Sequence, residues 1–505
     1  MTTAELPPDE PLHHWSASEI AQAVRSRRIT ARAVVDQVLS RIAEIDPVVR
    51  AYAVVDAEGA RRAAALVDTR LDAGEDVGPL AGVPFSVKDL VPTQGVETSF
   101  GSHVFAGNLP AKDAVAVARL RGAGAILLGK TTTPEFGHKA LTSSPRYGHT
   151  RNPWALDRSP GGSSGGSCAA VAAALGPISL TTDGSGSSRI PASACGVLGL
   201  KPTQGLIPNE NAVELFTNFI TLGLAARSAE DLALSLGVVA GAHAADPWSR
   251  AVPRTRYEVA IDPLAALAGL RVRVIRKMGN QRLAQAAQQR LDELISRLRG
   301  AGARVNEDAD PQMDWGGKTM FAMMRGYQQH RLKAMGREHA QRIDPTLVQA
   351  LREGEAQHAE ELQRAPADRA ELYKRVEALL ADADVLLTPT VSAGAPRVDH
   401  RQDEDFSIDG EVVGKLRQQW YCYTGAFNLT GHPALSVPMG FDADGLPLGA
   451  QFVGPWFSEA RLIDLAAAVD QLIPYRALRP PLAQGSLSRH QGGWLAYPST
   501  GGWAA

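Results

Sequence analysis

The sequence predicts an α/β fold in which helices pack over a largely buried sheet. Short apolar runs alternate along the chain with longer segments whose apolar residues recur every three to four positions, as expected of strands and amphipathic helices in turn. With 505 residues, of which 44% are hydrophobic and 21% charged, the chain has enough apolar material for a large core. No internal repeat or long linker interrupts the sequence, which favours a single large domain.

The N-terminal part is predicted to begin with helices. Ser16 and Glu19 have the spacing of a capping box, in which the two side chains satisfy free backbone N–H groups. A second helix is predicted from Thr30, because apolar residues then recur at 3.6-residue spacing: Val34, Val35, Val38, Leu39, Ile42 and Ile45. A strand, a helix and a buried strand are predicted next, at residues 82–87, 111–122 and 125–128.

The same alternation continues to the end of the chain. An alanine-rich helix is predicted at residues 167–175, stopped by Gly176 and Pro177, and a strand at residues 178–182. A strand–helix–strand unit is predicted from residue 270 to 305, followed by a mostly helical, charged stretch at 312–365. The last predicted strands lie at residues 385–387, 434–439 and 447–453, and the final two flank an Asp-Gly hairpin turn.

Charge and composition exclude several classes of function. The chain has 52 basic and 54 acidic residues, and its basic residues form no cluster, so we expect no nucleic-acid partner. No apolar stretch reaches the ~20 residues needed to cross a membrane, and residues 1–10 lack the pattern of a secretory signal. The cysteines, Cys168, Cys195 and Cys422, have no metal-ligand spacing and are too sparse for a disulfide framework. We therefore expect a cytoplasmic protein without a metal.

Two serine- and glycine-rich segments and a distant lysine carry the chemical signal. The sequence GGSSGGS at residues 161–167 directly precedes the predicted alanine-rich helix, and DGSGSSR at 183–189 follows a predicted strand, where ligand sites of α/β sheets gather. Lys88 ends a short apolar strand, a position at which lysine is usually paired or has a lowered pKa. A lysine with a lowered pKa can act as the base that a serine nucleophile needs. Together the segments predict a serine nucleophile activated by a lysine.

Each feature alone also has an ordinary structural explanation. Lys88 can pair with Asp89, and the serines can cap a helix or form polar turns. The sequence GAILLGKT at residues 124–131 matches the phosphate-binding loop motif, but its apolar interior is typical of a core strand.

A second motif predicts different chemistry. Residues 162–166 match the nucleophile elbow of Ser-His-Asp esterases with an α/β-hydrolase fold. That elbow must follow a strand, whereas residues 151–160 are interrupted by prolines, and His400 and His432 are only nominal candidates for the catalytic histidine. The esterase remains an alternative.

Taken together, the segments resemble the amidase signature family. The resemblance covers roughly residues 15–475 and is most specific at residues 160–205, where the two serine segments are followed by IPASACGVLGLKPT. It extends to residues 82–89, 129–135, 150–154, 427–434 and 445–451.

This resemblance implies the amidase signature fold, a single α/β/α-layered domain over residues 1–505 with a mixed central sheet. Its core would cover residues 15–475, and residues 160–205 would form the signature region. The remaining implied regions are variable substrate-lining segments at 204–222, 312–335 and 415–425, and a C-terminal tail at 484–505 that we expect to be poorly ordered or to add a docking strand.

The resemblance also assigns catalytic roles. Ser187 would be the nucleophile, Ser163 the bridging serine after a cis peptide bond, and Lys88 the base. The oxyanion hole would consist of backbone N–H groups of four consecutive residues: Gly184, Ser185, Gly186 and Ser187. Ser185 and Ser188 depart from the glycine and branched aliphatic residue usual in the family. No metal or cofactor is required.

The implied reaction is hydrolysis of a linear amide through an acyl-enzyme, giving a carboxylic acid and ammonia or an amine. We expect apolar or aryl amides of small size as substrates, with esters and carbamates as further possibilities, and a monomer or homodimer. Apolar residues of the variable segments, equally suited to the core, would line the pocket: Phe216, Phe219, Met320, Phe321, Met323, Met324, Trp420, Tyr421 and Tyr423. A partner-dependent amidotransferase subunit is a further alternative, although residues 204–222 do not resemble those subunits.

Overall fold

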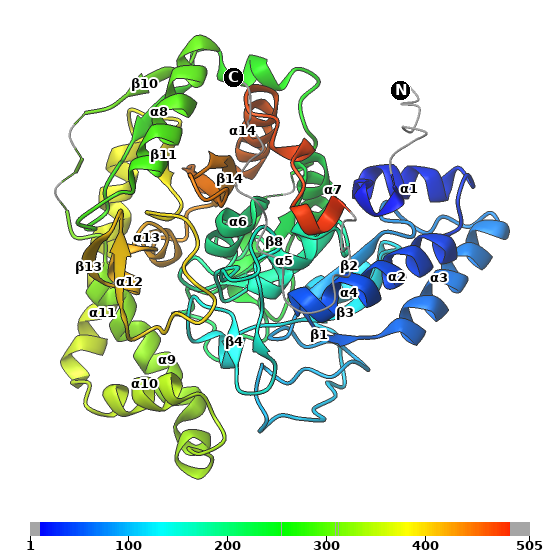
Figure 1. Ribbon diagram of the computed structural model, residues 1–505, viewed down its shortest axis with the longest axis horizontal. Helices are drawn as coiled ribbons and strands as arrows, with labels where there is room; N and C mark the ends of the chain where they lie inside the picture. The colour runs from blue at the N-terminus through cyan, green and yellow to red at the C-terminus, as the bar shows by residue number, and fades with distance from the viewer. Residues whose placement is uncertain (1–10, 254, 309, 312, 485–505) are drawn as a thin grey trace, which may run out of the picture.

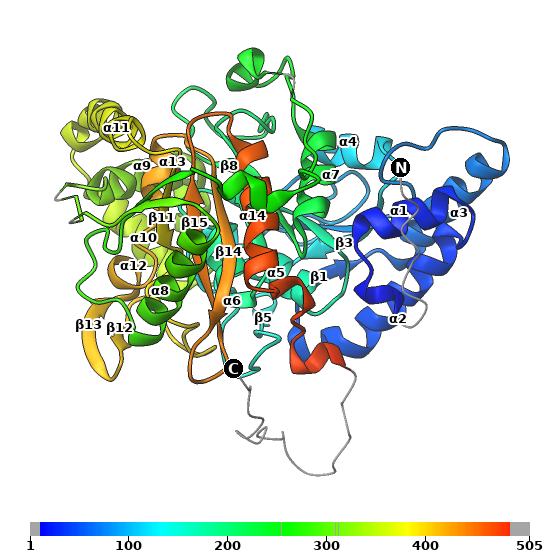
Figure 2. The same ribbon diagram turned by 90° about the horizontal axis from the view of Figure 1, so that it is seen from above.

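One sheet of eleven strands organises the molecule. The computed structural model describes residues 11–484 except 254, 309 and 312, and its central sheet has the strand order β1-β3-β2-β6-β8-β7-β14-β15-β11-β9-β10. Parallel pairs, such as β2 with β6, coexist with antiparallel pairs, such as β14 with β15. Helices pack against the sheet along its length (Figures 1 and 2). The predicted α/β fold with a mixed central sheet is confirmed.

The N-terminal helices form as their sequence pattern predicts. Ser16 and Glu19 make the reciprocal capping box of the first helix, and the Thr30 side chain caps the second. All six predicted face residues of the second helix are buried. The elements are α1 (Ala17–Arg25), α2 (Ala31–Val49), β1 (Tyr52–Val55) and α3 (Ala57–Asp72).

The middle of the chain supplies the centre of the sheet. Its elements are β2 (Pro84–Lys88), α4 (Val115–Gly122), β3 (Ile126–Thr131), β4 (Ser143–Ser144), β5 (Gly148–His149), α5 (Gly165–Ala172), β6 (Ile178–Asp183), α6 (Arg189–Cys195), β7 (Leu198–Lys201), β8 (Thr221–Ala226) and α7 (Ala229–Val239). The match to the phosphate-binding loop thus falls largely on the buried strand β3.

Two helix boundaries in this region differ from prediction. Helix α4 starts later than residue 111, because Asp113 accepts a hydrogen bond from the Gln94 N–H and the Ala114 N–H donates to Pro92. Helix α5 ends before residue 175, because Ala174 adopts a φ of 60° and the Leu175 N–H turns back to the Ala170 carbonyl.

The C-terminal half completes the sheet and adds a helical segment. Its elements are β9 (Arg271–Val274), α8 (Gln285–Gly300), β10 (Arg304–Asn306), α9 (Gly317–Glu338), α10 (Pro345–Glu355), α11 (Ala359–Leu380), β11 (Val385–Pro389), β12 (Asp405–Ile408), β13 (Glu411–Lys415), α12 (Leu416–Gln419), α13 (Gly425–Leu429), β14 (Ala434–Phe441), β15 (Pro447–Val453) and α14 (Glu459–Leu472). Short 3-10 helices are η1 (Leu12–His14), η2 (Glu135–Gly137), η3 (Pro247–Ala251), η4 (Pro263–Leu267), η5 (Tyr475–Ala477) and η6 (Pro481–Gln484). Helices α9–α11 lie at the opposite end of the molecule from α1–α3 (Figures 1 and 2).

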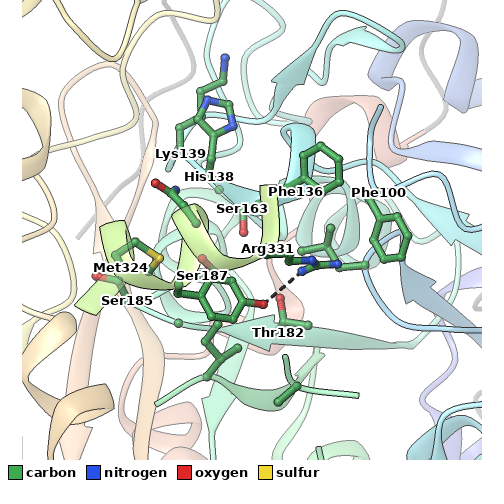
Figure 3. Close-up of a pocket in the computed structure, with 18 of the residues that line it drawn as sticks. Phe100, Phe136, His138, Lys139, Ser163, Thr182, Ser185, Ser187, Met324 and Arg331 are labelled. Atoms are coloured by element: carbon green, nitrogen blue, oxygen red, sulfur yellow. Dashed lines mark hydrogen bonds between the residues drawn. The ribbon is translucent and has the colours of Figure 1, made fainter. Parts of the chain in front are cut away.

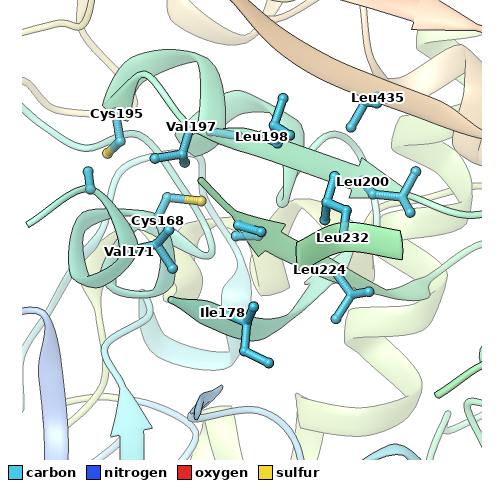
Figure 4. Close-up of a cluster of buried hydrophobic side chains, with 14 of the residues drawn as sticks. Cys168, Val171, Ile178, Cys195, Val197, Leu198, Leu200, Leu224, Leu232 and Leu435 are labelled. Atoms are coloured by element: carbon cyan, nitrogen blue, oxygen red, sulfur yellow. The ribbon is translucent and has the colours of Figure 1, made fainter. Parts of the chain in front are cut away.

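Helix α5 packs on the central strands in the core. Cys168 and Val171 of α5 and Leu198 of β7 have no exposed surface, and Ile178 of β6 is 2% exposed (Figure 4). Burying one such aliphatic side chain contributes about 1.5–3 kcal/mol. This packing holds the N-terminal end of α5 against the end of β6, where the two serine segments lie.

Two predictions concern residues beyond this description. The expected lack of a secretory signal rests on residues 1–10, and the tail prediction concerns residues 484–505. Residues 1–10 and 485–505 lie outside the described residues. Within the described part of the chain, no helix is both long and apolar enough to cross a bilayer.

Candidate active site

The topology brings the lysine and both serine segments together. Strands β2 and β6 are parallel neighbours, so Lys88 at the end of β2 lies beside Thr182 near the end of β6. The Lys88 side-chain nitrogen Nζ donates to Ser163 Oγ at 2.7 Å and to Thr182 Oγ1 at 2.9 Å. The Ser164 N–H donates to the Ser187 carbonyl oxygen at 3.1 Å, which ties the two serine segments to each other. The Gly162–Ser163 peptide bond is cis.

Burial sets the protonation of Lys88. Its side chain has no exposed surface, and this desolvation lowers the pKa of Lys88 to about 7, although Asp183 and Cys168 act in the opposite direction. The Asp89 carboxylate instead accepts hydrogen bonds from Ser99 and from the Gly101 N–H. Lys88 therefore exists partly as a neutral amine near pH 7 and can accept a proton through Ser163.

A buried ion pair shapes the loop that carries Ser187. The Asp183 carboxylate accepts from Arg189 Nη2 at 2.9 Å and from the backbone N–H groups of Gly186 and Ser188, and both charged side chains are fully buried. Burial alone would raise the pKa of Asp183, but the Arg189 guanidinium outweighs it and holds the pKa well below its usual range. The carboxylate is therefore anionic at neutral pH and fixes the path of the loop.

The Arg189 guanidinium connects this loop to distant strands and helices. It donates to the Thr424 carbonyl, to Gln451 Oε1 at 2.7 Å and to Asn428 Oδ1 at 2.6 Å. The Asn428 amide in turn donates to the carboxylate of Asp183 at 3.0 Å. Asp183, Arg189, Asn428 and Gln451 belong to the segments that match the family, and Thr424 to a variable segment, but their network was not predicted. An acid and an arginine flanking the Ser187 loop are the signal that could have indicated it.

The proposed oxyanion hole requires one correction. The Gly186 N–H donates to the Asp183 carboxylate at 2.6 Å, so it is already engaged and unsuited to the role expected of it. Gly184, Ser185 and Ser187 line the cavity, so their N–H groups remain the candidates for an oxyanion.

The two departures from the family pattern are accommodated locally. The left-handed φ of this loop, 108°, falls on Gly186, where an added Cβ would lie 2.2 Å from Thr424 Oγ1, and not on Ser185. Ser188 is buried, and its hydroxyl lies 2.6 Å from Thr181 Oγ1, which satisfies the polar group that replaces an aliphatic side chain.

A cavity of about 260 Å³ opens over the serines. Ser163 and Ser187 lie near its centre, with Met324 on one side and Phe100, Phe136 and Arg331 on the other (Figure 3). Its apolar wall includes Leu90, Val91, Phe100, Phe136, Ile220, Leu222, Met320, Met324 and Leu332.

The residues expected to line the substrate pocket divide into two groups. Met320 and Met324, both on α9, line the cavity, as does Tyr421. The expectation is wrong for the remaining six, which are not among the lining residues: Phe216, Phe219, Phe321, Met323, Trp420 and Tyr423. Phe216 is 74% exposed, Phe219 packs in the core, and Trp420 is fully buried, with its indole N–H donating to the Ala393 carbonyl at 2.9 Å. An aromatic residue in a variable segment is as well suited to the core as to a pocket, and the sequence does not distinguish the two locations.

Several cavity residues were not predicted. Phe100 and Phe136 lie on connections outside the variable segments, and the arginines Arg331 and Arg417 were not expected because the predicted lining was apolar. The charged character of the predicted helical stretch at 312–365 is the signal that could have indicated Arg331.

His400 and His432, the histidines considered for the esterase alternative, form no serine–histidine pair in the described part of the chain. His432 Nε2 lies 2.9 Å from Glu377 Oε1 and His400 packs on Phe406, and neither lines the cavity. His138 does line it, but its ring nitrogens lie 2.8 Å from the Glu135 carbonyl and from Thr346 Oγ1. Among the described residues, no His, Cys, Asp and Glu side chains gather in a group that could hold a metal ion.

Comparisons with known proteins point to one class, amidases and their amidotransferase-subunit relatives. The sequence profile of the family described as "Amidase" matches residues 33–463. An acylamidase of Rhodococcus erythropolis is 34% identical over 474 residues, covering 94% of this chain and 98% of the relative. A glutamyl-tRNA(Gln) amidotransferase subunit of Roseiflexus sp. strain RS-1 is 33% identical, over 93% of this chain and 99% of its own length.

Solved structures agree with the sequence relatives. A bacterial aryl acylamidase of the amidase signature family superposes with a TM-score of 0.84 at 27% identity, over 94% of this chain and 99% of its own. The chain belongs to the amidase signature family, as its sequence segments predicted. This membership supports hydrolysis of a C–N amide bond.

Proposed function

We propose that the chain is an amidase in which Ser187 is the nucleophile, Ser163 relays the proton and Lys88 is the base. The contact of 2.7 Å between Lys88 Nζ and Ser163 Oγ, at the floor of the cavity that Ser187 also lines, carries this proposal. The lowered pKa of Lys88, about 7, supplies a base that is partly neutral at physiological pH.

The reaction proceeds in two halves. Ser187 Oγ attacks the amide carbonyl carbon while its proton passes to Ser163 and the Ser163 proton to Lys88. The backbone N–H groups of Gly184, Ser185 and Ser187 stabilise the oxyanion, and the proton held on Lys88 returns through Ser163 to the departing amine. Water then attacks the acyl-enzyme by the same relay and releases the carboxylic acid.

The cavity wall supports an amide with an apolar part. Phe100, Phe136, Met320 and Met324 offer aromatic and aliphatic surface to a substrate held near Ser187. We propose apolar or aryl amides as the preferred substrates. The same acyl transfer also serves esters and carbamates.

Labelling with a fluorophosphonate probe tests the nucleophile. Intact mass and peptide mapping are expected to show one adduct on Ser187, absent from Ser187→Ala. Ser185→Ala is the matched control, because it removes a neighbouring hydroxyl in the same cavity and retains the backbone N–H, so it is expected to label. An adduct on Ser163 or Ser164 would favour the esterase chemistry instead.

A partner-dependent amidotransferase subunit is a second candidate, because relatives named as subunits of glutamyl-tRNA(Gln) amidotransferase match over nearly their full length. The two candidates differ in what the purified chain does alone. An amidase hydrolyses simple anilides unaided as a monomer or homodimer. Labelling of Ser187 without any anilide turnover, together with a co-purified partner protein, would favour the amidotransferase candidate.

A further inference from the structure

The cavity has a charge asymmetry that an apolar substrate does not explain. Four basic residues line it, His138, Lys139, Arg331 and Arg417, whereas none of the described residues that line it is an aspartate or a glutamate. A basic cavity of this kind attracts anionic groups.

Two of the four basic residues contribute no net charge at neutral pH. Lys139 donates to the Asp344 carboxylate at 2.6 Å, so its charge is neutralised. Burial lowers the pKa of His138 to about 4, even with Asp344 nearby, so its ring is neutral. The positive charge of the cavity therefore comes from Arg331 and Arg417.

Aromatic rings hold both guanidinium groups in place. Arg331 lies over the ring faces of Phe100 and Phe136, 5.1 and 5.8 Å from their centroids, and donates to the Tyr327 hydroxyl at 3.1 Å (Figure 3). This arrangement keeps the guanidinium of Arg331 beside the cavity rather than in bulk solvent.

Arg417 is held in the same way. Its guanidinium lies 4.6 Å from the centroid of Phe321, and its Nε donates to the Tyr421 hydroxyl at 3.0 Å. Within the described part of the chain, neither Arg331 nor Arg417 has a carboxylate within ion-pair distance, and each has further N–H donors available.

Arg325 shows that the lack of a carboxylate partner goes with lining the cavity and not with lying on helix α9. Arg325 lies on α9 as Arg331 does, but it pairs with Glu353 at 2.9 Å and does not line the cavity. The arginine that faces away from the cavity is thus neutralised, while the one that faces it is left for a ligand.

We propose that Arg331 and Arg417 bind a carboxylate that the substrate carries away from its scissile amide. This inference rests on the proposed amidase function and deepens it: the substrate has an apolar body, which contacts the aromatic and methionine wall, and an anionic end. Guanidinium–carboxylate hydrogen bonds are charge-assisted and gain strength where water is partly excluded. The carboxylate belongs either to the acyl part or to the departing amine.

Matched substrate pairs test the two positions. For the acyl part, the mono-p-nitroanilide of adipic acid is compared with the p-nitroanilide of hexanoic acid, which has the same chain length and a terminal methyl group. For the amine part, p-(hexanoylamino)benzoate is compared with hexanoyl p-toluidide. We expect kcat/KM to favour the carboxylate in at least one pair by about 10- to 100-fold, the range for a hydrogen bond to a charged group.

Variants connect this preference to the two arginines. In Arg331→Gln and Arg417→Gln the ratio of kcat/KM for the carboxylate over the neutral partner is expected to fall by about 10-fold or more, mainly through KM. Arg331→Lys is expected to retain part of the ratio. Arg337→Gln is the matched control on α9, because Arg337 pairs with Glu355 and lies outside the cavity lining, and it should leave the ratio unchanged. The ratio of kcat/KM in each variant is compared with the same ratio in the wild type, so intrinsic differences in reactivity between the two substrates cancel.

The outcomes separate this inference from the proposed function. Turnover of the neutral anilides with no preference for either carboxylate would overturn the inference and leave the amidase intact. A preference that survives in both Arg→Gln variants would also overturn it. Absence of turnover for all four substrates, together with no probe adduct on Ser187, would instead contradict the amidase function.

Discussion

The floor and the wall of the cavity are built on different principles. The floor consists of the segments 161–167 and 183–189 with Lys88, and its charged side chains are fully buried and hydrogen-bonded, Lys88 to Ser163 and Arg189 to Asp183. The wall is formed by segments far apart in the chain, and side chains such as Arg331 are only half-buried. The floor is built from three short segments with distinctive residues that buried polar contacts hold together, whereas the wall is built from apolar and aromatic side chains of many separate elements.

The largest effects are expected at the floor. Ser187→Ala and Lys88→Met are each expected to lower kcat by about 10⁴-fold or more, because they remove the nucleophile and the base of one relay. Anilide hydrolysis measures the loss, and circular dichroism confirms that each variant is folded.

Lys201→Met is the control for loss of any buried lysine. Burial lowers the pKa of Lys201 to about 7 as well, but Lys201 donates to the Pro202 carbonyl and lies outside the cavity lining. Its replacement is expected to lower kcat by less than about 10-fold. An equal loss of kcat in both lysine variants would indicate that removal of any buried lysine lowers kcat, whether or not that lysine contacts Ser163.

The ion pair beneath the Ser187 loop is expected to give the largest effect on stability. Arg189→Met leaves the Asp183 carboxylate buried without its partner, which typically costs about 3–5 kcal/mol. Denaturant unfolding measures the change. Glu353→Gln, which breaks the partly exposed pair with Arg325, is expected to cost less than about 1 kcal/mol. Similar costs for the two variants would contradict the difference between a fully buried and a partly exposed ion pair.

The pH dependence of this stabilisation has a definite sign. The pKa of Asp183 is lower in the folded chain than its ordinary value, so the folded state binds fewer protons than the unfolded state. The contribution of the ion pair is therefore present at neutral pH and is lost as the pH falls below the usual range of an aspartate. The difference in unfolding free energy between wild type and Arg189→Met should shrink in acid.

The pH dependence of catalysis directly tests Lys88 as the proposed general base. Because the pKa of Lys88 is lowered to about 7, the neutral and active form of the amine is lost below that pH. We expect kcat/KM to rise about tenfold per pH unit in the acidic range and to level off above about pH 7. A rate that climbs to the ordinary pKa of lysine would contradict a base tuned by burial.

The sequence predicted the floor much better than the wall, for a physical reason. Each of the three segments alone has an ordinary structural explanation, but their combination resembles the amidase signature family, and that resemblance singled out Lys88, Ser163 and Ser187. The fold brings these three residues together as expected. The Gly186 N–H was misassigned because its partner is a carboxylate whose orientation depends on Arg189.

The wall was predicted poorly because the type of an apolar residue does not indicate what its side chain packs against. Phe219 and Trp420 belong to the core, while Tyr421, the next residue after Trp420, reaches the cavity. Neighbouring positions thus face different environments: Trp420 packs on Phe406 in the core, whereas Tyr421 lines the cavity. The cation–aromatic contacts of Arg331 likewise join segments distant in sequence.

The smallest expected effects separate true wall residues from their exposed neighbours. Met324→Ala removes apolar surface from the cavity and is expected to raise KM for apolar anilides about 3- to 10-fold, since each buried methylene contributes about 0.8 kcal/mol. Phe216→Ala removes a larger side chain that is 74% exposed and outside the lining, so KM should not change. Steady-state kinetics on a series of anilides with longer acyl chains measures both. A larger change in KM for Phe216→Ala than for Met324→Ala would mean that the 204–222 segment closes over bound substrate and belongs to the cavity wall.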